Sequence, residues 1–221
     1  MLELIQPISK RDQVIRALKE AILTGTMEPG ASIVETKVAQ MLGAGVPLIR
    51  EALIELEHQG FVQRTPYKGT TVTKLGPTEI QRIFRLRVEL EALAIEWAKE
   101  HVTDADLESL RQHIRVMEQA AIDLDLTQFY EADLAFHRKI WNMSDNPYLS
   151  DALERVVVPL FAFFLMKTSR RRNSYVESAA MHASIVEALP EKTAAELREM
   201  VKQSLAGWKD EMLHLLFSET P

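Results

Sequence analysis

Three segments in the second half of the chain each place polar side chains on an otherwise apolar helical face. Residues 127–141 put Asp133 and His137 one turn apart on such a face, and two later segments add His182 and Ser204. Buried polar groups need partners, so these inward-facing groups favour a hydrophilic cavity that a first-row divalent ion could occupy. The alternative is an Asp133–His137 ion pair beside an unrelated buried His182, because this four-residue spacing is common.

The same residues would also suit a metal-dependent hydrolytic enzyme, in which Asp133, His137 and His182 leave an open position for an activated water. Such an enzyme needs a well-placed general base or a substrate-phosphate loop, and the sequence offers no evident candidate for either. We therefore expect that the protein is not an enzyme.

A further buried polar group is expected at Arg87, which falls on the apolar stripe of Ile83, Leu90 and Ala94. A buried guanidinium requires an anion. Glu91, another internal carboxylate or the carboxylate of a bound ligand could supply it.

Helices alone are predicted to position these residues. No glycine occurs between Gly76 and Gly207, and apolar residues recur there at helical spacing. Pro159 is expected to kink one helix, and Arg170, Arg171 and Arg172 are expected to form a solvated corner. The predicted helices span residues 78–100, 104–124, 127–141, 148–167, 178–189 and 193–217.

The first third has a different pattern, because glycines there separate short periodic segments. Helices are predicted over residues 10–23, 35–42 and 47–59, and strands over residues 61–64 and 70–73. The predicted fold is mainly α, with an N-terminal winged helix-turn-helix followed by an all-α helical bundle. The predicted domains are residues 1–74 and 78–221, joined by a linker over residues 75–77.

The front helices fit a helix-turn-helix. Ala39, Gly43 and Ile49 have the spacing of the small residue, the turn glycine and the closing apolar residue of that motif. Pro47 would begin the second helix, and Arg50 lies one turn further, where its guanidinium could contact a guanine or a phosphate.

The predicted hairpin would form a wing beside this motif. Its loop carries Arg64, Lys68 and Gly69, and two cations at a tight turn suit contact with phosphates or the minor groove. The alternative is a small α+β core with scattered solvated cations, because helix-turn-helix matches also arise by chance.

Composition limits these interpretations. The chain has 221 residues, 26 Lys+Arg, 32 Asp+Glu and no Cys, which excludes disulfides, Cys-based zinc sites and thiol nucleophiles. Residues 1–74 carry a net charge of +1 and the remainder −7, so the front part is the better suited to approach DNA. No apolar run is long enough to span a bilayer, and we expect a soluble, cytoplasmic protein with no membrane partner.

The segment from Val14 to Val72 contains the patterns LxxAIxxGxxxPG and REALxxLxxxGFVxxxPxxG. It resembles the winged helix-turn-helix of GntR-type bacterial regulators. The resemblance implies a dimer that binds double-stranded operator DNA through Arg50, Lys68 and Gly69, with Pro47, Gly45 and Arg64 at the same surface. The chain departs from the family at Gly45-Val46, where a helix-capping Ser and a DNA-contacting Arg are usual.

The pieces LRVELE, DLAFH, NPYL and HASIVEAL resemble the all-helical FCD effector domain of the FadR-like branch of these regulators. In that family an Asp, the His four residues on and a later His bind a divalent metal together with a final His. The resemblance implies that Asp133, His137 and His182 bind Zn, Ni or Mn. It also implies that Arg87 and Asn146 contact a small organic-acid effector.

Ser204 stands where the family has its fourth metal ligand, and the nearby His214 should not replace it, because a ten-residue offset rotates it to another face. A serine hydroxyl is a poor neutral ligand, so weaker metal binding is expected, with water or the effector at this position. In the metal-free alternative, Ser204 and the histidines contact the effector directly. The sequence thus predicts a homodimeric transcriptional regulator, by default a repressor, that responds to a small carboxylate metabolite.

Overall fold

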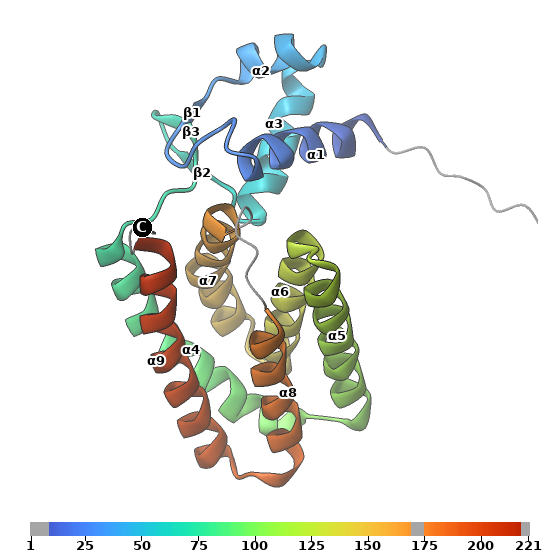
Figure 1. Ribbon diagram of the computed structural model, residues 1–221, viewed down its shortest axis with the longest axis vertical. Helices are drawn as coiled ribbons and strands as arrows, with labels where there is room; N and C mark the ends of the chain where they lie inside the picture. Colours follow the sequence, from blue (N-terminus) through green and yellow to red (C-terminus); the bar gives the residue numbers. More distant parts are fainter. Residues whose placement is uncertain (1–8, 169–174, 218–221) are drawn as a thin grey trace, which may run out of the picture. The chain divides into compact units, whose positions relative to one another are not determined.

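The computed structural model describes residues 9–168 and 175–217, so the predicted corner at Arg170, Arg171 and Arg172 lies outside the described residues. The chain divides into two compact units, residues 1–74 (unit 1) and residues 75–221 (unit 2). Helices dominate both units, and a small sheet belongs to unit 1 (Figure 1). The predicted mainly α class is confirmed.

Unit 1 combines three helices with an antiparallel sheet of strand order β1-β3-β2. Its elements are α1 (Lys10–Leu23), β1 (Ser32–Ile33), α2 (Glu35–Leu42), α3 (Val46–His58), β2 (Val62–Thr65) and β3 (Gly69–Val72). The sequence predicted all of these except β1. That strand has two residues, too few for a periodic signal, and it forms by pairing with β3.

The helix-turn-helix of unit 1 is built as its spacing predicted. Ala39 and Ile49 are buried where α2 meets α3, and Gly43 ends α2 with a φ of 60°. This left-handed conformation favours glycine because a Cβ would strain the backbone. The chain can therefore turn sharply between the two helices.

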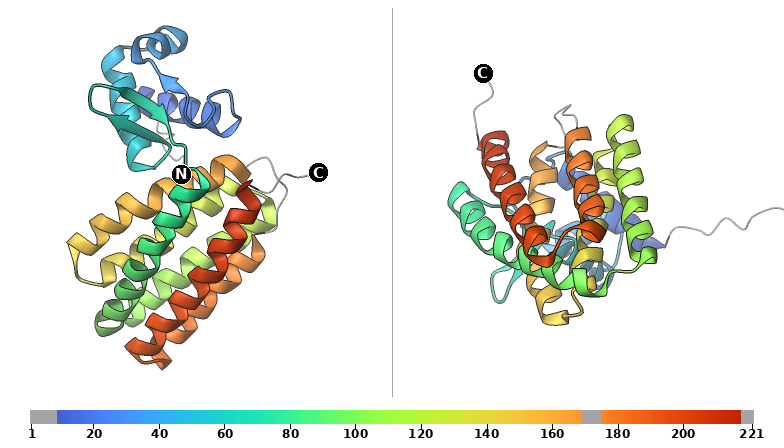
Figure 2. Two further views of the ribbon diagram at one scale, coloured as in Figure 1. Left: turned by 90° about the vertical axis from the view of Figure 1, so that its left-hand side faces the viewer. Right: turned by 90° about the horizontal axis from the view of Figure 1, so that it is seen from below.

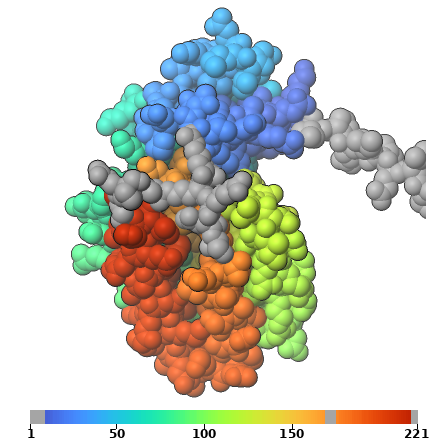
Figure 3. Space-filling view, in the orientation of Figure 1, coloured from blue at the N-terminus to red at the C-terminus, as the bar shows by residue number. Residues whose placement is uncertain are grey.

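Unit 2 contains only helices within its described residues. They are α4 (Pro77–His101), α5 (Asp104–Asp123), α6 (Leu126–Met143), α7 (Pro147–Thr168), α8 (Val176–Glu191) and α9 (Ala194–Phe217). Helices α4 and α9 run side by side (Figure 2), and α8 lies between α5 and α9 on the face shown in Figure 3. Within the described residues, no helix is long and apolar enough to cross a membrane.

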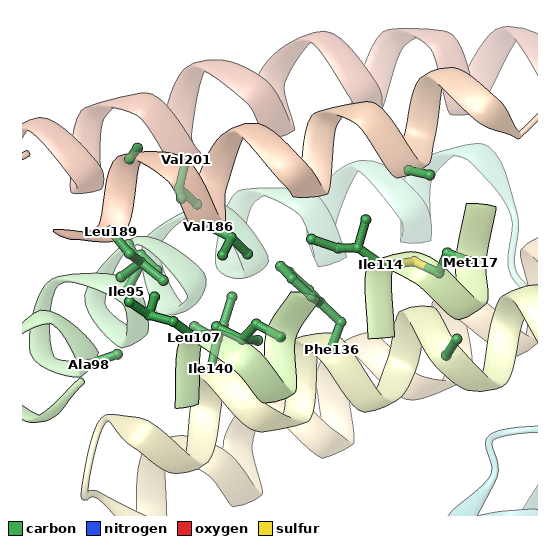
Figure 4. Close-up of a cluster of buried hydrophobic side chains, with 14 of the residues drawn as sticks. Ile95, Ala98, Leu107, Ile114, Met117, Phe136, Ile140, Val186, Leu189 and Val201 are labelled. Atoms are coloured by element: carbon green, nitrogen blue, oxygen red, sulfur yellow. The ribbon is translucent and has the colours of Figure 1, made fainter. Parts of the chain in front are cut away.

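The core of unit 2 is formed by side chains that point toward one another from several helices (Figure 4). Ile95 of α4, Phe136 and Ile140 of α6, and Val186 and Leu189 of α8 are buried members of this cluster. Full burial of such a side chain contributes about 1.5–3 kcal/mol, so the cluster fixes the relative positions of the helices that carry the polar residues.

The start of α5 is held by a helix cap and by a charge pair with α6. The Asp106 backbone N–H donates to the Thr103 hydroxyl, the Thr103 N–H donates to the Asp106 carboxylate at 3.0 Å, and Lys139 pairs with the same carboxylate. Hydrogen bonds from Lys139 and Thr103 lower the pKa of Asp106 to about 2. When folding lowers the pKa of a carboxyl group, the charged group stabilises the folded state at any pH above its pKa in the unfolded chain. This stabilisation is lost as the pH falls toward the pKa in the folded state.

Asp106→Asn is therefore expected to lower the free energy of unfolding by about 1–2 kcal/mol at pH 7, and by much less near pH 2, where wild-type Asp106 is protonating. Urea unfolding at both pH values measures the difference. Asp210→Asn is the control, because Asp210 is exposed and forms its ion pair with the adjacent Lys209. An equal loss at the two pH values would contradict this account of Asp106.

Candidate functional site

The polar side chains predicted to face inward meet at one cavity in unit 2. Asp133 and His137 reach it from α6, His182 from α8, Arg87 from α4 and Ser204 from α9. The cavity has a volume of about 90 Å³. One water needs roughly 10–15 Å³ on this measure, so the cavity has room for several waters or a small organic molecule.

Asp133, His137 and His182 form a tight cluster on one wall. The His182 Nε2 atom lies 2.9 Å from Asp133 Oδ1 and 3.2 Å from His137 Nε2. His137 Nε2 lies 3.6 Å from the same Asp133 oxygen. One potential metal-binding atom from each residue thus lies within 4.8 Å of the others.

The outer nitrogens of the two imidazoles set which tautomer each neutral ring adopts. His182 Nδ1 lies 2.6 Å from the carbonyl oxygen of Ser178, and His137 Nδ1 lies 3.1 Å from Glu91 Oε2. Both oxygens can only accept, so each Nδ1 carries a proton, and each Nε2 presents a lone pair to the cluster when it carries none. Asp133 Oδ1 is then buried without a hydrogen-bond donor. Three converging acceptors require a cation, and a divalent metal fits this donor set.

Without a metal, the cluster holds a proton instead. Burial alone lowers the pKa of His182, but the charge and hydrogen bond of Asp133, the Ser178 carbonyl and the charge of Glu91 together outweigh it, and the net shift is upward. Burial raises the pKa of Asp133, but the charge and hydrogen bond of His182 and the charges of His137 and Arg87 together outweigh it, and the net shift is downward. A metal ion at these atoms therefore has to displace a proton.

Arg87 is paired on one side only. It is 2% exposed, its Nε donates to Glu91 Oε1 at 2.6 Å, and its Nη1 is buried without a hydrogen-bond partner. Burial raises the pKa of Glu91, but the charges of Arg87 and His137 lower it overall to about 2, so Glu91 remains an anion. Glu91 thus supplies the predicted internal counter-charge, and Arg87 Nη1 remains available to a second acceptor.

The other predicted effector residues lie in different surroundings. Ser204 is half-buried and lines the cavity from α9, whereas His214 is exposed and lies outside the lining. Asn146 is also outside the lining, and its side-chain oxygen accepts hydrogen bonds from the backbone of Tyr148 and Leu149, each at 3.1 Å. Asn146 therefore caps the start of α7, and the structure does not bring it to the cavity with Arg87.

The helix-turn-helix of unit 1 exposes the residues predicted to face DNA. Pro47 and Gly45 are exposed at the start of α3, where Gly45 makes no side-chain cap. Arg50 is also exposed, and its Nη2 lies 2.7 Å from the carboxylate of Glu35 at the start of α2. The ion pair with Glu35 was not predicted, because the partners are fifteen positions apart, far beyond the three- or four-residue spacing at which side chains of one helix meet. It orients the guanidinium before any DNA is bound.

The wing also exposes its predicted residues. Arg64, Lys68 and Gly69 are all exposed, and Gly69 has a φ of 89°. The tip residue Tyr67 is fully exposed with a φ of 64°, a strained conformation for a residue with a Cβ. Tyr67 was not predicted to lie at the tip, although its position between Pro66 and Gly69 was a signal for the turn.

Two family models match the chain in the order of its units. Residues 10–72 match the bacterial regulatory proteins of the gntR family, and residues 82–207 match the FCD domain. The chain belongs to the GntR family.

Relatives with known sequences agree with this assignment. The HTH-type transcriptional regulator McbR of Escherichia coli K12 is 30% identical over 66% of this chain and 66% of its own. The uncharacterized regulator YdhC of Bacillus subtilis 168 is 30% identical over 65% of each chain. The matched region is thus slightly under two thirds of either relative.

Solved structures show the same architecture over a longer region. The structure of E. coli McbR/YncC superposes with a TM-score of 0.69 at 25% identity, covering 93% of this chain and 99% of that one. A GntR structure from Rhodococcus sp. RHA1, at 18% identity and a TM-score of 0.68, shares the fold. GntR proteins of this type are DNA-binding transcriptional regulators, so the family assignment decides against the hydrolase alternative.

Proposed function

We propose that this GntR-family transcriptional regulator is a homodimeric repressor that leaves its operator when a small carboxylate binds in the cavity of unit 2. The observation that carries the proposal is the buried Arg87 Nη1, which has no hydrogen-bond partner and belongs to a cavity-lining side chain. A carboxylate provides the charged acceptor that such a nitrogen lacks.

A divalent metal, Zn, Ni or Mn, would be held by Asp133, His137 and His182. Their lone pairs converge, and Glu91 and Ser178 orient the two imidazoles from behind. When bound, the metal adds positive charge to the cavity and an open position for an oxygen of the effector. Ser204 lines the same cavity but is a poor ligand, which favours water or the effector as a further ligand.

Control of DNA binding requires that the effector favour one arrangement of the paired DNA-binding units over another. We propose that the carboxylate changes the spacing of the two wings in the dimer. A palindromic operator with fixed half-site spacing would then be bound less tightly.

Operator titrations test this proposal. An operator is first selected from a random-sequence DNA library, and its affinity is then measured at fixed salt with and without carboxylates that raise the melting temperature of the protein. The proposal predicts weaker operator binding with at least one such carboxylate. Unchanged operator affinity with every stabilising carboxylate would contradict it.

Arg50→Ala is expected to weaken operator binding by about 1–3 kcal/mol, because it removes a guanidinium placed to contact a base or phosphate. Fluorescence anisotropy at fixed salt measures the change. Arg111→Ala is a matched control, since Arg111 has a similarly exposed side chain, 50% against 54% for Arg50, and lies in unit 2. Equal affinities of Arg50→Ala and Arg111→Ala would refute the role of Arg50.

A further inference from the structure

We propose that the effector is a monocarboxylic acid with an apolar chain or aromatic ring, not a small hydroxy acid or a di- or tricarboxylate. This inference rests on the proposed carboxylate site and specifies the remainder of the ligand. It follows from the change from polar to aromatic lining residues with distance from Arg87.

The charged end of the cavity is bounded by Phe161 of α7. Its ring centroid lies 4.8 Å from the Arg87 guanidinium carbon and 5.2 Å from the centroid of His137. The carboxylate of a ligand that reaches Arg87 Nη1 would therefore lie beside this ring. Phe161 marks the point where the polar cluster meets apolar wall.

An aromatic wall follows one helical turn further along α7. The Phe164 ring packs against Trp208 of α9, with centroids 5.4 Å apart, and against Tyr175, with centroids 6.3 Å apart. All three residues line the same cavity. Aromatic faces and edges provide large apolar contact area for a ring or an alkyl chain.

The dimensions of this wall set the length of the apolar part. Phe164 lies three residues beyond Phe161, about 4.5 Å along the helix axis, and Met212 lies four residues beyond Trp208, about 6 Å further along α9. The wall thus remains apolar for about 5–10 Å from the charged end. A ligand with only two or three carbons would leave most of it uncovered.

The charged side chains of the cavity lie at one end of it, with Arg87. Among the described lining residues, Arg87 is the only Arg or Lys. A second carboxylate at the far end of the ligand would lie against Phe164 and Trp208, where burial of a charge without a partner is costly.

Calorimetric titration of the full chain tests the inference with named probes. Butanoate, hexanoate, octanoate and 3-phenylpropanoate are compared with lactate and citrate. Each buried methylene is expected to tighten binding about three- to fourfold, so octanoate should bind far more tightly than butanoate or lactate. Octanamide, which has the same chain and no charge, should bind at least tenfold more weakly than octanoate.

Variants locate the two ends of the ligand. Trp208→Leu is expected to weaken octanoate and 3-phenylpropanoate about tenfold and to leave butanoate within about twofold. Trp97→Leu is the control, because Trp97 is also half-buried in unit 2 and lies outside the cavity lining. Arg87→Gln should remove the preference for octanoate over octanamide.

The outcomes separate this inference from the proposed function. If lactate or citrate binds more tightly than octanoate and depends on Arg87, the carboxylate site stands and the apolar ligand is wrong. If octanoate and octanamide bind equally, both the carboxylate site and this inference fail. The octanamide comparison needs no variant, so it decides even where Arg87→Gln does not fold.

Discussion

Ser204→His is expected to raise the affinity for zinc or nickel by more than about 100-fold. Ser204 lines the cavity that also holds Asp133, His137 and His182. An imidazole at residue 204 adds a fourth ligand, which completes the tetrahedral coordination that zinc prefers. Substitution of a residue that hydrogen-bonds to a metal ligand alters metal affinity about 10–100-fold. Gain of a direct ligand should therefore have a larger effect. Competition with a chromogenic chelator at pH 7.5 measures the affinity.

Gln203→His is the matched control for this gain. Gln203 is the adjacent residue of α9, but it is exposed and lies outside the cavity lining. The added imidazole should leave tight metal binding unchanged. Equal affinities of Ser204→His and Gln203→His would show that α9 does not present residue 204 to the three ligands.

Arg87→Leu is expected to lower the free energy of unfolding by about 3–5 kcal/mol at pH 7. The substitution leaves the Glu91 carboxylate buried without its counter-charge, and breaking a buried pair on one side has this cost. The low pKa of Glu91 means that the carboxylate stays charged in the wild-type protein at any pH well above 2. Denaturant unfolding measures the loss.

The double variant Arg87→Leu/Glu91→Leu separates this charge effect from lost packing. Removal of both charges should restore more than half of the lost stability, because no unpaired carboxylate remains. The recovery should be incomplete, since His137 Nδ1 also loses its acceptor. A double variant as unstable as Arg87→Leu would mean that packing against Phe161, not charge, sets the cost.

Periodicity and turn residues predicted most of the fold. The long helices were predicted because unbroken apolar stripes set their length, and the turn between α2 and α3 because Gly43 adopts a conformation that other residues avoid. The short strand β1 was missed, since its pairing partner lies almost forty residues away along the chain. Strand pairing over such a distance leaves no local pattern.

The sequence predicted which polar residues are buried in the candidate site but not which atoms they contact. A polar residue on an apolar stripe indicates burial, and this is why Arg87 and His182 were expected inside unit 2. The stripe does not say which atoms meet, so the choice of Glu91 as the partner of Arg87 needed the structure. Asn146 was predicted to contact the effector because it lies within a family motif. Its side chain instead caps a helix, so membership of a motif does not by itself place a residue in the cavity.

Native mass spectrometry of the full chain after incubation with zinc or nickel detects metal bound at Asp133, His137 and His182. We predict a dimer that carries one metal per chain. We also predict that Asp133→Ala abolishes metal binding, while Asp210→Ala, at an exposed residue of α9, retains it. A metal-free wild-type dimer, or a metal that persists in Asp133→Ala, would contradict the proposed three-residue metal site.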